Sequence, residues 1–175
     1  MAIEIERREL NRRVFASAGV ASLIVGSVWM QRASAATPPA KAFEITKTPE
    51  DWKKALTPAQ YHVLRDHGTE RAGTSPLDKV YDPGVYNCAG CDLPVYSSET
   101  KFNSGTGWPS FWKELDNAVG TSIDKSFFST RTEVHCRRCG GHLGHIFEDG
   151  PKPTGLRHCL NGVALKFVPK TKAAS

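Results

Sequence analysis

The five cysteines of this 175-residue sequence divide by spacing into two pairs and one single residue. The pairs are Cys88/Cys91 and Cys136/Cys139, each with two residues between the thiols. Two such turns are typical of a closed tetrahedral site for structural zinc, with one ion per chain. Two disulfides are the alternative, and an iron centre is less favoured because no further cluster features accompany the four thiols.

The fifth cysteine, Cys159, lies in the segment Arg157–Asn161 (RHCLN) and has no obvious partner in the sequence. A thiol beside Arg157 and His158 is typical of a nucleophile whose thiolate is favoured by positive charge, although a lone cysteine is often a buried structural residue. In a strand, the period of two places Arg157, Cys159 and Asn161 on one face. We therefore expect a cation on one side of the thiol, and on the other an amide that orients a histidine or binds substrate.

Two histidines upstream, His142 and His145, are three positions apart. An ordinary strand directs such residues to opposite faces, so both reach one site only if Gly144 between them permits a bend or a bulge. Zinc ligation is an alternative role, but four cysteines already complete a tetrahedral shell. We expect both imidazoles to lie beside Cys159 and to serve there as acid–base groups, a role for which they are suited because imidazole titrates near neutral pH.

Three motifs then occur in order: Ser104–Phe111 (SGTGWPSF), His142–His145 (HLGH) and Arg157–Asn161 (RHCLN). Together with the two cysteine pairs, they make the sequence similar to a B-type methionine sulfoxide reductase, the class that acts on the R epimer. The resemblance runs from about Glu50 to Phe167. It implies reduction of methionine sulfoxide, protein-bound or free, by attack of the cysteine thiolate on the sulfoxide sulfur, which leaves a cysteine sulfenic acid.

The resemblance also implies roles for individual residues. His145 is expected to donate a proton to the sulfoxide oxygen, with His142 as its partner, because attack on sulfur makes that oxygen more basic. Trp108 is expected to form the apolar wall for the methyl group, with Phe147 as a second wall. The family's usual resolving cysteine is replaced by Thr106. A thioredoxin-like protein or a small thiol must then reduce the sulfenic acid.

The expected fold class is mainly β within the α+β class, with two small antiparallel sheets and short N-terminal helices. Proline at the first helical position and a capping box predict helices over about 48–55 and 57–67, with His62 and His67 solvated. No long helix separates the β-prone runs that follow Gly68, which favours antiparallel pairing over a parallel βαβ fold. The predicted strands include 80–81, 85–86, 93–96, 127–134, 143–148 and 157–167.

Residues 1–35 resemble a twin-arginine signal for bacterial export. Arg12-Arg13 precede the uncharged run Val14–Met30, and Ala33–Ala35 (ASA) offers a cleavage site. We expect a linker over 36–47, one reductase domain over 48–170 and a tail over 171–175. Cleavage would leave the domain in the periplasm or another extracytoplasmic space after only transient membrane contact, whereas an uncleaved segment would serve as a membrane anchor.

The net charge of +5 does not indicate a nucleic-acid partner. Residues 1–35 hold five arginines and three glutamates, and the remainder has 18 basic and 15 acidic residues. The competing hypothesis is a non-catalytic zinc module that binds nucleic acid or protein through basic loops. Few basic clusters support it, namely Arg137-Arg138 and the trio Lys166, Lys170 and Lys172. We expect a monomeric enzyme.

Overall fold

The computed structural model describes residues 43–126 and 129–171; the expected export signal, most of the linker and most of the tail lie outside these ranges. Two helices open the described part, α1 (Pro49–Ala55) and α2 (Pro58–Asp66), and each follows a threonine N-cap. Thr57 forms the expected capping box with Gln60. Both predicted helices are confirmed to within a residue or two at each end. No described helix has the length and apolar content that a membrane span requires.

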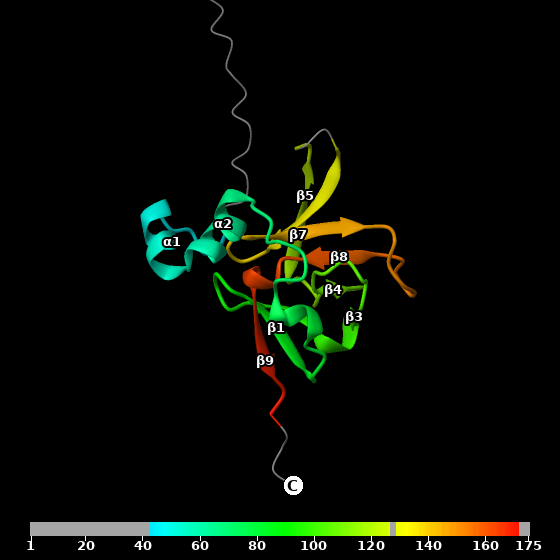
Figure 1. Ribbon diagram of the computed structural model, residues 1–175. Coiled ribbons are helices and arrows are strands. Elements are labelled where there is room, and N and C mark those ends of the chain that lie inside the picture. Colours follow the sequence, from blue (N-terminus) through cyan, green and yellow to red (C-terminus); the bar gives the residue numbers. More distant parts are fainter. Residues whose placement is uncertain (1–42, 127–128, 172–175) are drawn as a thin grey trace, which may run out of the picture. The chain divides into compact units, whose positions relative to one another are not determined.

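The described residues form nine strands in two antiparallel sheets (Figure 1). The smaller sheet has the order β2 (Pro94–Ser97), β1 (Gly84–Cys88), β9 (Leu165–Pro169). The larger sheet has the order β3 (Lys101–Phe102), β4 (Ser110–Phe111), β8 (Arg157–Leu160), β7 (His142–Phe147), β6 (Arg131–Cys136), β5 (Val119–Asp124). Short 3-10 helices are η1 (Pro76–Lys79), η2 (Ser98–Thr100) and η3 (Gly162–Ala164). The mainly β fold with two antiparallel sheets is therefore confirmed.

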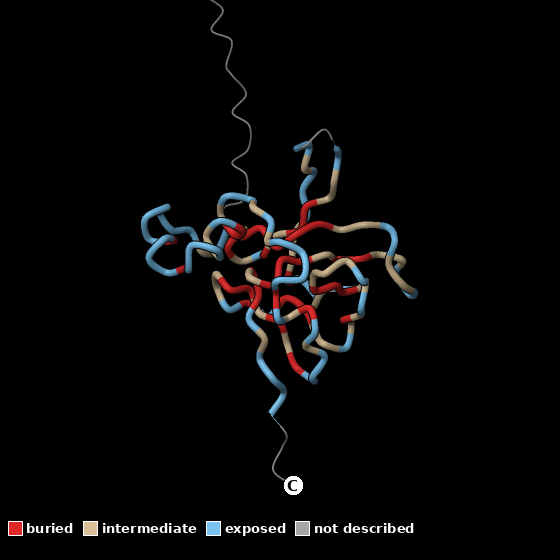
Figure 2. The backbone as a smooth tube through the Cα atoms, in the orientation of Figure 1, coloured by how far each residue is buried: buried red, intermediate tan, exposed pale blue. Residues whose placement is uncertain are grey.

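The core lies where the two sheets and α2 meet, as the buried backbone segments in Figure 2 show. Phe111 joins the sheets, because its ring centroid lies 5.0 Å from that of Tyr86 and 4.7 Å from that of Tyr96. The helices contribute Trp52 and Leu64, both buried. Burial of side chains of this size is worth about 1.5–3 kcal/mol each, so this junction is a main source of stability.

Several strand predictions differ from the structure. The two-residue strands β3 and β4 were not predicted, and the predicted strand 127–134 begins only at Arg131, with residues 127–128 outside the described ranges. Residues 80–81 form no strand, because the Val80 N–H donates to Leu77 at the end of η1. The predicted strand 157–167 is two strands in different sheets, since Gly162 and Val163 donate their N–H groups to the Glu70 carboxylate and turn the chain into η3. The edge strand β5 was missed because its largely exposed side chains lack a clear apolar period.

Strand β7 is both bulged and closely packed against β8. Its register with β6 pairs Val134 with Gly144 and His135 with His142, so Leu143 is an extra residue in the ladder. On the other side, a Cβ atom at Gly144 would overlap the backbone carbonyl of Cys159. Glycine at this position therefore permits the approach of the two strands.

We predict that Gly144→Ala lowers the free energy of unfolding by about 3 kcal/mol, because the added methyl group meets backbone atoms that cannot rotate away. Chemical denaturation of both proteins measures the difference. Gly90→Ala is the matched control, since a Cβ there would have ordinary contacts of 3.6–3.7 Å. Equal stability of the Gly144→Ala variant and the parent protein would contradict the close strand approach.

Candidate active site

Cys159 occupies the central part of the larger sheet. It lies on β8 directly opposite His145 of β7 and Ser110 of β4. Directly opposed residues of antiparallel strands project to the same face, so the thiol and the imidazole are neighbours. Both line a pocket of about 130 Å³. The residues lining this pocket are Thr69, Trp108, Arg131, Gly144, His145, Phe147, Cys159, Leu160 and Asn161.

A bulge in β7 brings the two histidines to one side despite their odd spacing, but the extra residue is Leu143 and not Gly144, where it was expected. Because Leu143 is the extra residue, His142 and His145 lie on the same side of the strand. Their ring centroids are 5.2 Å apart, with the ring planes at 65°. His145 lines the pocket, whereas His142 is fully buried beside it and is not a pocket residue. His142 is therefore placed to act on His145.

Each of these imidazoles bonds to a carboxylate that the sequence analysis did not identify. Nε2 of His145 lies 2.8 Å from Oδ2 of Asp124, and Nδ1 of His142 lies 2.7 Å from Oε1 of Glu133. Asp124 belongs to β5, the strand that was not predicted, and Glu133 to β6. The sheet register sets Glu133 opposite His145 and Asp124 opposite Arg131, so these two hydrogen bonds appear only in the side-chain geometry.

The two carboxylates are ionised and act as acceptors. The hydrogen bond from His142 lowers the pKa of Glu133 to about 2, with further support from Ser122 and His67. Hydrogen bonds from Ser126 and then His145 lower the pKa of Asp124. Each imidazole therefore donates its bonded N–H, and in His145 this leaves Nδ1 as the nitrogen for another partner.

Burial sets the resting protonation states of the reactive pair. It lowers the pKa of His145, against the opposing effect of the Asp124 hydrogen bond. It raises the pKa of Cys159, and the nearby Arg157 and Thr106 offset this only in part. Arg157 favours the thiolate, as expected, but desolvation outweighs it and keeps the pKa of Cys159 above its ordinary value.

Arg157 and Asn161 are both beside the pocket, but their polar groups have other partners. Arg157 binds the Asp149 carboxylate through two hydrogen bonds of 2.8 and 2.9 Å, and its guanidinium lies 4.5 Å from the Phe147 ring centroid. Asn161 accepts from the Glu70 N–H at 2.9 Å and donates to the Leu143 carbonyl at 3.1 Å. Asn161 thus joins the loop after α2 to the bulge in β7.

The glycine-rich motif contributes a wall and a hydroxyl to the pocket. Trp108 is half-buried, and its Nε1–H donates to the Glu70 carbonyl at 3.1 Å, which fixes the indole. Phe147 lines the same pocket from β7. Oγ1 of Thr106 lies 4.0 Å from Sγ of Cys159, so the motif does approach the thiol.

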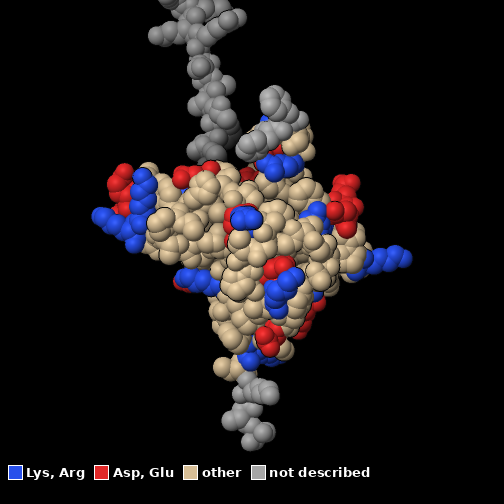
Figure 3. All heavy atoms as spheres, in the orientation of Figure 1, with Lys and Arg blue, Asp and Glu red and all other residues tan. Residues whose placement is uncertain are grey.

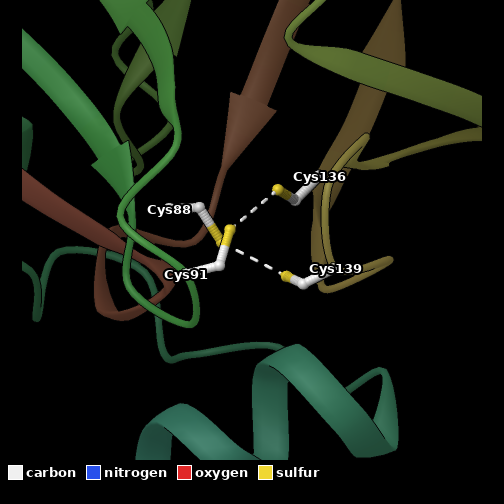
Figure 4. Close-up of side chains that lie close together, drawn as sticks. All are labelled: Cys88, Cys91, Cys136 and Cys139. Atoms are coloured by element: carbon white, nitrogen blue, oxygen red, sulfur yellow. Dashed lines mark hydrogen bonds between the residues drawn. The ribbon is translucent and has the colours of Figure 1, made fainter. Parts of the chain in front are cut away.

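The four paired cysteines converge at a second site. Figure 4 shows the side chains of two turns, one after β1 and one after β6, pointing toward one another. Sγ of Cys88 is 3.8 Å from that of Cys139, and Sγ of Cys91 is 3.5 Å from that of Cys136. Tetrahedral bonds of about 2.3 Å to a shared zinc ion give sulfur separations of about 3.8 Å. The thiols fit a metal ion and are not disulfides.

Comparison with known proteins decides the family, because the SelR domain matches residues 56–169. The chain belongs to the SelR family. It is 53% identical over 126 residues to "Peptide methionine sulfoxide reductase MsrB" of Leptospira interrogans, covering 71% of this chain and 96% of that protein. The protein of the same name from Agrobacterium fabrum is 49% identical, with 72% and 94% coverage, and that from Methanosarcina barkeri is 54% identical, with 70% and 87% coverage.

We predict that this SelR-family protein holds one metal ion per chain and that Cys136→Ser loses both the ion and stability. Structural metal binding contributes directly to folding, so removal of one ligand is destabilising. Elemental analysis and thermal denaturation of the purified protein measure both effects. A metal-free parent protein with the same stability as the variant would contradict a structural metal site.

We also predict that the rate of alkylation of Cys159 by iodoacetamide becomes half-maximal only above pH 9, which is the ordinary pKa of a cysteine thiol. Only the thiolate reacts, and burial raises its pKa. Mass spectrometry of the modified peptide follows the reaction, with Cys159→Ser as the blank. Replacing Arg157 with methionine should raise the midpoint further. A midpoint below about pH 8 would show that Arg157 and Thr106 outweigh burial.

Proposed function

We propose that this protein reduces the R epimer of methionine sulfoxide and thereby repairs oxidised proteins, with Cys159 as the nucleophile. One observation carries the assignment: Cys159 shares a pocket with an imidazole and two aromatic walls. Family membership supports the same chemistry, since relatives at about 50% identity are named peptide methionine sulfoxide reductases.

In the proposed first step, the Cys159 sulfur attacks the sulfoxide sulfur and forms an S–S bond while the sulfoxide oxygen receives a proton. The protonated oxygen then transfers to the cysteine sulfur as the S–S bond and the original S–O bond break. Methionine leaves with its sulfur reduced, and Cys159 is oxidised to a sulfenic acid. His145 supplies the proton because it lies opposite Cys159 and lines the same pocket. His142 and Asp124 position the His145 ring, through ring contact and a hydrogen bond respectively.

The apolar part of the substrate would lie between Trp108 and Phe147. The hydrogen bond from Trp108 to Glu70 holds the indole rigidly, and the Arg157 guanidinium stacks over Phe147. Sulfur–aromatic contacts are worth about 0.3–1.5 kcal/mol and suit a methyl sulfoxide. Aromatic walls also limit the water that reaches the sulfur atoms during attack.

Regeneration of the thiol requires an external reductant. The four other cysteines form the metal cluster, and Thr106 occupies the position of the family's usual resolving cysteine. A first thiol would form a mixed disulfide with Cys159 and release water. A second thiol would then attack that disulfide and regenerate the Cys159 thiol. A thioredoxin-like dithiol or a small thiol has the required chemistry.

The metal is best assigned as structural zinc. Four thiolate donors at these separations suit a closed zinc site, which has no open position for substrate. When bound, zinc supplies a cross-link between the turn after β1 and the turn after β6. The cysteines hold the ion, and the proposed reaction takes place in the separate Cys159 pocket.

A non-catalytic zinc module is not favoured. The face shown in Figure 3 carries basic and acidic side chains interspersed, with no extended basic surface on that face. A non-catalytic function also would not explain why the Cys159 thiol lies directly opposite the His145 imidazole. The catalytic assignment accounts for both sites in one chain.

Export to the periplasm by a twin-arginine route is part of the proposal, and Arg12-Arg13 with the following apolar run supports it. Such a route carries folded proteins, so zinc would bind before the thiols meet an oxidising compartment. Fractionation of cells that produce an Arg12→Lys, Arg13→Lys variant tests it. Undiminished export of that variant would refute a twin-arginine route.

We predict that Cys159→Ser abolishes reductase activity and leaves the fold intact. Replacing one half-buried sulfur with oxygen changes little packing, whereas the nucleophile is lost. Turnover of methionine sulfoxide with excess dithiothreitol, together with circular dichroism, measures both. Retention of more than about one-hundredth of the activity would refute Cys159 as the nucleophile.

A further prediction concerns Thr106. The parent protein should yield a sulfenic acid that a dimedone-type reagent traps after one equivalent of substrate, with no internal disulfide. Thr106→Cys should instead form a disulfide with Cys159, since the Thr106 hydroxyl is 4.0 Å from the Cys159 sulfur. Peptide mapping distinguishes the products, and Thr106→Ser is the control. A disulfide from Cys159 to a metal-binding cysteine in the parent protein would contradict the single-thiol cycle.

A further inference from the structure

Two imidazoles converge on one carboxylate oxygen beside the catalytic pocket. Nδ1 of His67 lies 3.0 Å from Oε1 of Glu133, and Nδ1 of His142 lies 2.7 Å from the same oxygen. The three ligand atoms are all within 4.8 Å of one another. His67 ends α2 in the left-handed conformation and was expected to be merely solvated, but its ring contacts that of His142 at 5.2 Å.

This cluster is accessible from solvent. The His142 side chain is 2% exposed and the Glu133 side chain 11%, whereas His67 is 64% exposed. All three line a groove of about 500 Å³ next to the catalytic pocket. The groove carboxylates Asp66, Asp124 and Glu133 outnumber its cations Lys125 and Arg131, which favours a cationic ligand.

The donor set has the chemistry of a transition-metal site. Two imidazole nitrogens and one carboxylate oxygen are ligands that zinc, nickel and cobalt accept, and three protein ligands leave a position open to water. Donor atoms bound tetrahedrally at about 2.0–2.1 Å to one ion lie about 3.3–3.4 Å apart, so the present contacts of 3.0 and 2.7 Å to Glu133 need to widen by less than about 1 Å to admit an ion. Ser122 donates to the other oxygen of Glu133 and holds the carboxylate in place.

We propose that His67, Glu133 and His142 form a second metal site, selective for a divalent transition-metal ion, whose occupation inhibits the enzyme. The inhibitory part rests on the proposed reductase function; the binding part does not. An ion on His142 acts next to His145, because the two rings are in contact, with centroids 5.2 Å apart. Coordination replaces the 2.7 Å hydrogen bond between His142 and Glu133, so the His142 ring shifts against His145 and displaces that ring from its position opposite Cys159.

The same geometry limits the affinity. Binding at Nδ1 moves the ring proton of His142 to Nε2, a buried atom with no hydrogen-bond partner among the described residues. A buried N–H without an acceptor is unfavourable. The site should therefore fill only after the cysteine cluster, and a chelator should empty it first. This order suits a reversible inhibitory site rather than a permanent structural one.

The binding test uses the purified protein with zinc already on its four cysteines. Titration with Co²⁺ is expected to load one further equivalent, with the visible bands of nitrogen and oxygen ligation and without thiolate-to-cobalt charge transfer. His67→Ala should weaken this binding at least tenfold. His62→Ala is the matched control on the exposed face of α2 and should bind as the parent does. Unchanged binding by His67→Ala, no further equivalent, or thiolate charge-transfer bands would each overturn the site.

The activity test adds Zn²⁺ to the zinc-loaded parent enzyme and the two variants. The parent and His62→Ala should be inhibited reversibly, with activity restored by a chelator, whereas His67→Ala should need at least tenfold more Zn²⁺. Equal inhibition of all three proteins, or none in the parent, would overturn the inhibitory role. The cobalt titration requires no turnover, so it tests the site even if the protein proves inactive as a reductase.

Discussion

The pairing of β7 with β8 is the constraint on which the rest of the structure depends. It places His145 opposite Cys159, and it is possible only because Gly144 has no side chain to meet the Cys159 backbone. The bulge at Leu143 then turns His142 to the same side as His145. The aromatic core and the cysteine cluster join the larger sheet, which carries both strands, to the smaller one. A small change in this strand pair would separate the Cys159 thiol from the His145 imidazole.

Burial of the reactive pair explains its protonation. A low dielectric raises the pKa of Cys159 and lowers that of His145, so both groups are neutral at rest. The Cys159 thiol carries the one proton that the sulfoxide oxygen needs, and the neutral His145 ring can accept that proton and pass it on. In the proposed reaction, that proton passes from sulfur through His145 to the substrate, with no uptake from solvent. In that proposal, Asp124 would stabilise the His145 imidazolium that arises on the way, through its hydrogen bond to Nε2.

Local sequence signals predicted the parts of the fold that depend on local chemistry. Proline and the capping box located α1 and α2, and paired spacing identified the metal-binding cysteines. Long-range register was not predictable: β5 has no clear period, so Asp124 was missed as the partner of His145. The raised pKa of Cys159 was not predictable for a related reason, since the burial of this thiol depends on strands distant in sequence.

The central claim is that Cys159 reduces one epimer of methionine sulfoxide in a pocket formed by Trp108, Phe147 and His145. The most direct test is turnover of the separated R and S epimers by the purified protein with excess dithiothreitol. The account predicts rapid reduction of the R epimer and none of the S epimer, because an asymmetric pocket admits only one arrangement of oxygen, methyl group and chain. Reduction of the S epimer alone, or of neither, would contradict it.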